Sequence, residues 1–261
     1  GFYRLGVWDD EPDDKRLAAF DGLDDIVKTT SETFMGLTVG CARCHDHMFD
    51  PISQQDYYQM LSFFRNVRYY DKPKYEWDSA TYSPLISPLE VFNWKNKKNK
   101  PKNAKPPWDG HEFAMTVREH GPIAKDTHLL IRGNAGRPSK KVEPEFLKIL
   151  ASSKPKIPKS SNPFTTGRRL ALAKWITNSQ HPLTSRVMIN RIWQFHFGRG
   201  LVATPNDFGK AGMLCSNEAL LNWLAAEFIN NSWSIKHMHR VIMSSEVYRR
   251  TSWQNPDNQN T

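Results

Sequence analysis

Hydrophobic positions follow a helical period over much of the chain. From residue 23 to residue 37, apolar side chains recur every three or four positions, which predicts an amphipathic helix that ends at Gly36 or Gly40. Ser53, with Asp56 three positions later, forms a capping box. A second helix is therefore expected to begin at this point and to bury an apolar face.

The C-terminal third of the chain repeats this pattern. Pro182 is a favourable residue for the start of a helix, and Gly198 is a favourable residue for its end. Two later segments place leucine, isoleucine, methionine and aromatic side chains on one face. Helices are expected over residues 168–177, 182–198, 218–231 and 235–248.

Strand patterns are short. Residues 112–117 alternate enough for one strand, and residues 127–134 are typical of a second strand that runs into a turn. The two are expected to pair as a small sheet. The sequence thus predicts a mainly α protein with a small β element.

A proline- and lysine-rich segment separates these regions. Residues 71–125 are expected to be mostly irregular, and without the six lysines between residues 94 and 108 the net charge would be +3 instead of +9. Such a run usually forms a solvated loop, with an anionic partner or glycan as the alternative. Nucleic acid is not expected, because no zinc-finger spacing, RNA-recognition signature or basic helix is present.

Composition sets further limits. The 261 residues are 39% hydrophobic, which is enough for a buried core in one large or two modest domains. No apolar run approaches the roughly 20 residues of a membrane span. No signal peptide is visible, so export would have to be directed by a segment outside this sequence.

The most specific chemical signal is Cys41-Ala42-Arg43-Cys44-His45. Two cysteines three positions apart and an adjoining histidine are the pattern of covalent haem c attachment. Each thiol adds to one haem vinyl group, and the imidazole binds the iron. We therefore expect haem c on Cys41 and Cys44, with His45 as the proximal iron ligand. Because haem c is attached outside the cytoplasm, the motif also predicts a periplasmic or otherwise exported protein.

Three other interpretations of this motif stay open. Cys41 and Cys44 could bind zinc together with His45 or His47, because thiolates and imidazoles suit that ion. They could also form a redox-active thiol pair, or a disulfide whose short loop would be strained. The remaining thiol, Cys215, lies far away in the sequence.

The sequence around the motif resembles a known family. It is similar to the cytochrome-like domain of unknown function found in large secreted proteins of planctomycetes and related bacteria. The downstream sequence resembles the partner domain that follows it in the same proteins. The segments that carry the resemblance are residues 36–47, 49–52 and 56–58 in the first region, and 182–184, Val187, 190–193 and 196–202 in the second.

The resemblance implies an exported haem c protein without an established reaction. Residues 1–70 would form the cytochrome-like haem c region, lacking its N-terminal part, and would pack on the C-terminal helices. Residues 71–125 would be the connection, and residues 126–261 a helical partner domain with a short sheet at its start. One position departs from the family pattern: Met48 stands where a lysine is expected.

The motif does not identify the distal iron ligand. His47 is too close to His45 in the sequence to reach the opposite face of the haem. It is expected to make a hydrogen bond with Asp46 or Asp50, or to serve as a ligand in the alternative metal site. His196 is the remote candidate for the distal position, and the competing interpretation is a helix-end histidine bonded to backbone carbonyls.

Three functions follow from these alternatives. With both axial positions filled, the haem would exchange single electrons with a redox partner protein, and this is the function we expect. An open distal position would instead favour a haem-dependent oxidoreductase or peroxidase. A zinc ion at the motif would make the protein a non-redox structural or binding module.

Overall fold

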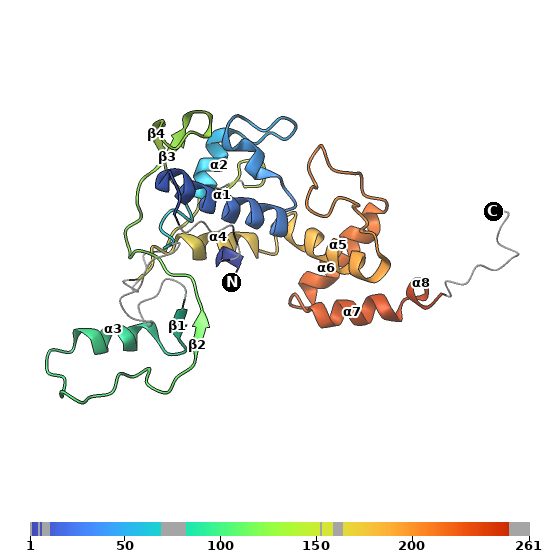
Figure 1. Ribbon diagram of the computed structural model, residues 1–261. Helices are drawn as coiled ribbons and strands as arrows, with labels where there is room; N and C mark the ends of the chain where they lie inside the picture. Colours follow the sequence, from blue (N-terminus) through green and yellow to red (C-terminus); the bar gives the residue numbers. More distant parts are fainter. Residues whose placement is uncertain are drawn as a thin grey trace, which may run out of the picture. The chain divides into compact units, whose positions relative to one another are not determined.

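The computed structural model describes residues 2–4, 6, 11–68, 82–151, 153–158 and 164–250. These residues form a mainly helical protein with short antiparallel strand pairs, which confirms the predicted fold class at this level (Figure 1). The chain divides into two compact units, the first formed by Gly1–Thr30 and Val39–Trp175, the second by Ser31–Thr38 and Ile176–Thr261. Each unit is described below by itself.

Two N-terminal helices lie where the sequence predicts them, but the first begins earlier than the hydrophobic pattern indicates. Helix α1 (Lys15–Phe34) begins after Asp14, whose carboxylate accepts hydrogen bonds from two main-chain amides of the first turn. The short 3₁₀ helix η2 (Val39–Arg43) follows, and helix α2 (Gln54–Leu61) starts at the predicted capping box. In this box the Ser53 hydroxyl accepts a hydrogen bond from the main-chain amide of Asp56, and the Asp56 carboxylate accepts one from the main-chain amide of Ser53.

Aromatic side chains form much of the core of the first unit. The Phe146 ring is stacked between Phe63 and Trp175, with ring centroids 5.6 Å and 4.5 Å away. Trp175 belongs to helix α4 (Arg168–Ile176). The stack therefore packs the region of Phe63 against residues that follow it by about a hundred positions in the chain. The other large buried side chains include Ile26, Val27, Tyr57, Tyr58, Met60, Leu61, Phe64 and Leu147.

The strands pair differently from the prediction. Strand β1 (Tyr82–Pro84) is antiparallel to β2 (Phe113–Met115), and β3 (Thr127–Leu130) is antiparallel to β4 (Pro138–Val142). The predicted pairing of residues 112–117 with residues 127–134 is therefore wrong. Residues 131–137 join β3 to β4 and include the 3₁₀ helix η4 (Ile131–Gly133). Because this connection is shorter than residues 116–126, which separate β2 from β3, the hairpin closes with a smaller loss of chain entropy.

Helix α3 (Pro88–Asn96) lies in the segment expected to be mostly irregular. The Ser87 hydroxyl accepts the amide of Leu89, and proline occupies the first helical position. Serine, proline and then Glu90 are a recognisable helix start that the sequence prediction did not include.

Among its described residues, the second unit contains the last turn of α1, three further long helices and one short helix. Helix α5 (Thr184–Phe197) ends at Gly198, which has a φ of +78°, and α6 (Glu218–Asn230) follows. The helix predicted over residues 235–248 is divided in two, α7 (Ile235–Ser244) and α8 (Glu246–Arg249). The break falls at Ser245, whose backbone is extended and whose hydroxyl caps α8.

The core of this unit lies between α5, α6 and α7. Its buried side chains are Ile189, Ile192, Leu201, Val202, Leu221, Leu224, Phe228, Met238 and Ile242. Residues 31–38 belong here because Arg191 donates hydrogen bonds to the carbonyls of Glu32 and Thr33. The carbonyl oxygen of Gly36 accepts a hydrogen bond from the main-chain amide of Phe208. Gly36 has a φ of +59°, and a Cβ at this position would clash with the Phe208 ring.

The compact units and the sequence-based regions divide the chain at different places. The boundaries expected at residues 70 and 125 both fall inside the first unit, which also contains the β3–β4 hairpin. None of the helices in the described part of the chain has the length and apolar character needed to cross a bilayer.

Candidate functional site

The Cys41–His45 motif begins inside the 3₁₀ helix η2 and ends just after it. Val39 and Ala42 point into the core, whereas Cys41, Cys44 and His45 are exposed. A 3₁₀ helix has three residues per turn, so side chains three positions apart lie on the same side. Both cysteines are free thiols and exposed, Cys41 inside η2 and Cys44 just after it.

The carbonyl of Arg43, in the middle of the motif, is held by two side chains of α2. Tyr58 donates its hydroxyl hydrogen to this oxygen at 3.0 Å, and Gln54 donates its side-chain amide at 2.9 Å. The same Gln54 nitrogen also donates to the carbonyl of Leu130 at 2.9 Å. Gln54 therefore ties the motif to strand β3.

The Arg43 side chain anchors the motif to helix α1. Its guanidinium lies 2.6 Å from Asp21 and 3.3 Å from Asp24, and the Tyr57 hydroxyl donates to Asp24 at 2.5 Å. Burial lowers the pKa of Arg43, but the hydrogen bond with Asp21 and the charge of Asp24 outweigh it, so the net shift is upward. Burial and Asp24 both raise the pKa of Tyr57. Arg43 therefore stays charged and Tyr57 stays protonated.

The main chain of the following residue orients the His45 ring. Its Nδ1 lies 2.6 Å from the main-chain carbonyl oxygen of Asp46. A carbonyl oxygen only accepts hydrogen bonds, so Nδ1 carries the ring proton and Nε2 keeps its lone pair. The Asp46 side chain accepts the amide of Gln54 at 2.7 Å, which fixes this residue in turn.

His47 stabilises the loop that follows the motif. Its ring is buried, and Nδ1 accepts the amides of Asp50 at 2.9 Å and Phe49 at 3.2 Å. Because Nδ1 accepts, the proton of the neutral ring is on Nε2, which therefore has no lone pair for a metal. The main-chain amide of His47 also donates to the carbonyl of Ile52. This arrangement has the character of the structural hydrogen bond expected for His47.

Gly133 lies directly against the second cysteine. It has a φ of +69°, and a Cβ built on it would lie 2.7 Å from Cys44 Sγ. The preceding residue, Arg132, is also left-handed at φ +52°. Gly133 was not expected from the sequence, because its contact with Cys44 bridges a large separation along the chain and no local signal marks it.

Exposed apolar side chains lie near the motif along the chain. Met48 and Phe49, which follow the motif in the sequence, are 76% and 54% exposed. Ile131, which is close in sequence to Gly133, is 42% exposed. Cys41, Cys44 and His45 are the side chains available for covalent attachment and iron ligation.

The zinc alternative requires further ligands beside the motif. Across residues 11–68, 82–151 and 164–250, no three His, Cys, Asp or Glu side chains converge to hold a metal ion. Cys215 belongs to the second unit, where it packs beside the core of α5, α6 and α7.

His196 lies in the last turn of α5, in the second unit. Its Nε2 is 2.8 Å from Nδ1 of His239 on α7, and the two rings meet edge to face. Burial, and then the neighbouring His239, lower the pKa of His196. His239 was not singled out in the sequence, and its role as a partner depends on the packing of α5 against α7.

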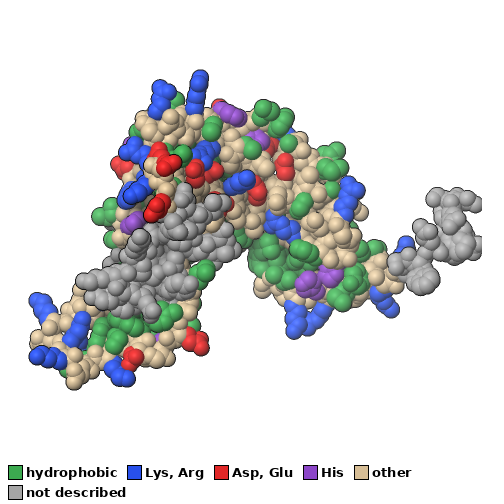
Figure 2. Space-filling model, in the orientation of Figure 1, with side chains coloured by type: hydrophobic (Ala, Val, Ile, Leu, Met, Phe, Trp, Pro, Cys, Tyr) green, Lys and Arg blue, Asp and Glu red, His purple; other side chains and the backbone are tan. Residues whose placement is uncertain are grey.

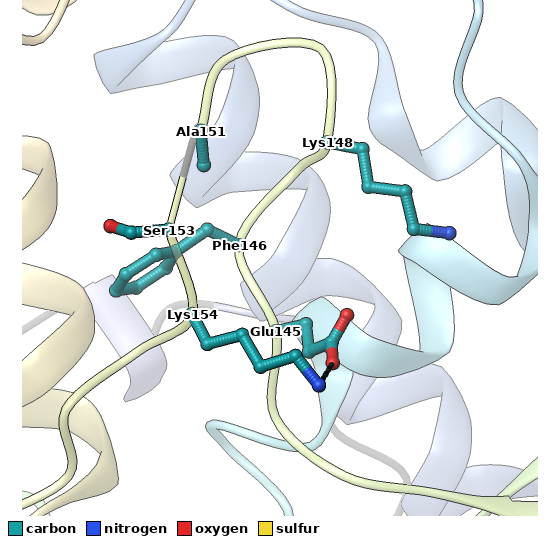
Figure 3. Close-up of a pocket in the computed structure, with 6 residues that line it drawn as sticks. All are labelled: Glu145, Phe146, Lys148, Ala151, Ser153 and Lys154. Atoms are coloured by element: carbon teal, nitrogen blue, oxygen red, sulfur yellow. Dashed lines mark ion pairs between the residues drawn. The ribbon is translucent and has the colours of Figure 1, made fainter.

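A shallow pocket of about 160 Å³ lies away from these residues (Figure 3). It is lined by Glu145, Phe146, Lys148, Ala151, Ser153 and Lys154. Its two lysines already have acidic partners, since Lys154 pairs with Glu145 and Lys148 pairs with Asp56. No residue of the motif lines this pocket.

Two family models match the chain. Residues 1–69 match PSCyt2, "Protein of unknown function (DUF1549)", and residues 168–261 match PSD1, "Protein of unknown function (DUF1553)". No curated protein and no solved structure matches the chain. The Cys41–His45 motif lies within the first match and His196 within the second. The chain thus contains two domains of unknown function in the order that the resemblance implies.

Proposed function

We propose that the protein is an exported c-type haem protein that transfers single electrons. Cys41 and Cys44 would carry the haem through thioether bonds, and His45 would be the proximal iron ligand. One observation carries the proposal: two exposed thiols lie three positions apart, one in η2 and one just after it, next to an imidazole that keeps its Nε2 lone pair.

The chain's own residues would prepare the motif for attachment. Bound haem c supplies an iron centre that gains and loses one electron. Gln54 and Tyr58 hold the motif backbone through the Arg43 carbonyl, and the carbonyl of Asp46 holds the His45 ring proton on Nδ1. Such fixed supports reduce the rearrangement that accompanies electron transfer and fix the ring orientation.

The ligand requirement favours haem over zinc. A structural zinc site needs four protein ligands, whereas haem c needs only the two thiols and the histidine that the motif provides. In the described ranges no further His, Cys, Asp or Glu completes such a zinc set.

The distal position decides between an electron carrier and a haem enzyme. His196 is the ligand expected from the sequence, and its Nε2 would have to leave His239 before it could bind iron. A filled distal position favours electron transfer, and an open one favours a peroxidase or another haem-dependent oxidoreductase.

Export and a redox partner protein are parts of the same proposal. Thioether attachment takes place outside the cytoplasm, and the resemblance is to secreted proteins. The six lysines between residues 94 and 108 are exposed on α3 and the loop after it, where an anionic protein or glycan could bind (Figure 2). Exposed lysines of this kind mainly raise the rate of encounter with an acidic partner.

The visible spectrum of the purified protein tests the proposal. A six-coordinate haem gives a low-spin spectrum and is unaffected by modest cyanide or peroxide, whereas an open site binds cyanide and reacts with peroxide. We expect a low-spin spectrum that His196→Ala alters. His47→Asn, which keeps an acceptor for the loop amides, is the control and should shift the spectrum only slightly. A high-spin wild type that His196→Ala leaves unchanged would contradict both the carrier function and the distal ligand.

A further inference from the structure

The histidine pair on α5 and α7 is a second cluster with ligand chemistry, separate from the Cys41–His45 motif. His196 Nε2 and His239 Nδ1 converge at 2.8 Å from two different helices. Both rings are half-buried, and histidine side chains are visible together on the surface of this part of the chain (Figure 2). Within the described residues neither ring forms an ion pair with a carboxylate, whereas His237 pairs with Glu227.

The distance between the two nitrogens is close to that of neighbouring ligands on one metal ion. Metal–imidazole bonds are about 2.0–2.1 Å long, so two of them at a right angle separate their nitrogens by roughly 2.9 Å. At the tetrahedral angle the separation is roughly 3.3–3.4 Å. At 2.8 Å the two nitrogens are close enough to bind one ion with little movement of the helices.

The surrounding residues hold the two rings in place. The Tyr248 ring meets His196 at a centroid distance of 5.3 Å and meets Phe197 at 5.7 Å. Phe197 stacks on Trp193, and Met238, the neighbour of His239, is fully buried. Rings that are already positioned lose little freedom when they bind an ion.

The electrostatics of α5 also favour a cation at this place. His196 lies in the last turn of a 14-residue helix. The carbonyl end of a helix carries a partial negative charge, which stabilises cations near the last turn.

We propose that His196 and His239 form a binding site for a divalent transition-metal ion, with Cu²⁺ preferred over Zn²⁺. Tetragonal nitrogen sites suit Cu²⁺ and Ni²⁺, and Cu²⁺ binds most tightly among the first-row divalent ions. Water would complete the coordination. In the hydrogen-bonded pair, one of the two facing nitrogens carries a proton. On metal binding this proton would move to the other nitrogen of the same imidazole ring. Both His196 Nε2 and His239 Nδ1 would then have a lone pair for the metal, and no net proton would be released.

This proposal does not depend on haem. The two assignments of His196 exclude one another in a single molecule, because one Nε2 lone pair cannot bind iron and a second metal together. Copper is therefore titrated into the haem-free chain, in which no iron competes for His196, and a failure of copper binding there leaves the haem proposal untouched.

The test is titration of the full chain with CuCl₂, after alkylation of its thiols with iodoacetamide so that they neither bind nor reduce copper. Calorimetry should give one tight site, and electron paramagnetic resonance should show two coordinated nitrogens. His196→Ala and His239→Ala should each weaken copper binding about 100-fold, since each removes one arm of a chelate. ZnCl₂ should bind more weakly than CuCl₂ to the wild type.

His237→Ala on the same helix is the matched control and should bind copper like the wild type. Circular dichroism checks that each variant is folded. The proposal is overturned if the wild-type chain has no tight copper site, because this result needs no variant. It is also overturned if either single variant keeps wild-type affinity, or if the resonance spectrum shows only one coordinated nitrogen.

Discussion

Gly133 is the residue outside the motif whose replacement should affect Cys44 most directly. A Cβ at this position would lie 2.7 Å from Cys44 Sγ. A free cysteine side chain can rotate away from such a contact, but a thioether bond fixes it. Gly133→Ala is therefore expected to lower the fraction of chains with both thioether bonds, measured by mass spectrometry of the haem peptide.

Gly110→Ala is the matched control. Gly110 is also left-handed, with φ +80°, but a Cβ added there would have no neighbour within 4 Å. Both variants carry the strain of a left-handed alanine, about 1–2 kcal/mol, and only Gly133→Ala adds the contact. Equal haem attachment in the two variants would show that Gly133 does not shape the cysteine site.

His181 makes the stability of the second unit depend on pH. Its Nδ1 accepts the amide of Thr184 at the start of α5, and the ring is buried. Burial lowers its pKa from 6.5 to about 4. Between these values the unfolded chain binds a proton that the folded chain does not, so stability is complete above the unfolded pKa and falls as the pH drops towards 4. The loss should reach about 3 kcal/mol.

Urea unfolding at pH 7.5 and pH 4.5 measures this loss. His181→Asn keeps an acceptor for the Thr184 amide but does not titrate, so its stability should fall less between the two pH values. An identical fall in wild type and variant would rule out His181 as the source of the pH dependence.

At the residue scale, sequence reasoning found the groups with distinctive chemistry but missed their supports. Cys41, Cys44 and His45 are recognisable because their spacing is specific. Gln54 and Gly133 are not, since the first is an ordinary helix residue and the second an ordinary turn glycine. Their roles arise only when distant segments of the chain pack against η2.

At the element scale, local signals predicted helices well and strand partners badly. The capping box at Ser53 and the C-terminal Gly198 act within one helix, so they are visible in the sequence. Strand pairing depends on contacts between separate segments of the chain, which local sequence does not specify. Strand β3 pairs with β4, the strand that follows it directly in the sequence. Ser245 divides the last predicted helix by capping a new one, a possibility that hydrophobic spacing does not reveal.

Helix α2 provides a test at this scale, because its first residue, Gln54, holds the motif. Ser53→Ala removes the hydroxyl that caps α2 and is expected to lower the free energy of unfolding by about 1 kcal/mol. Hydrogen exchange at the Asp56 amide, which the Ser53 hydroxyl caps, should become faster. Ser53→Thr keeps the hydroxyl and should behave like the wild type. A capping role is refuted if the alanine and threonine variants are equally stable.

At the scale of the whole molecule, the lysine-rich stretch lies inside the first unit and does not separate the two units. Its lysines are exposed, so limited trypsin digestion should cut first between residues 95 and 105. The fragments should stay together in gel filtration, because Phe146 stacks on Phe63 and Gln54 bonds to Leu130 across the cut. Fragments that separate under native conditions would contradict this packing.

Covalent haem attachment is the central claim, and its most direct test is the mass and colour of the denatured chain. The protein should be produced with an export signal in cells that attach haem c, and then extracted with acid acetone. We predict that the colour stays with the polypeptide, that the intact mass exceeds the sequence mass by one haem, and that replacing both Cys41 and Cys44 by serine abolishes both signals. A colourless chain of unmodified mass, or haem that the solvent removes, would contradict the account.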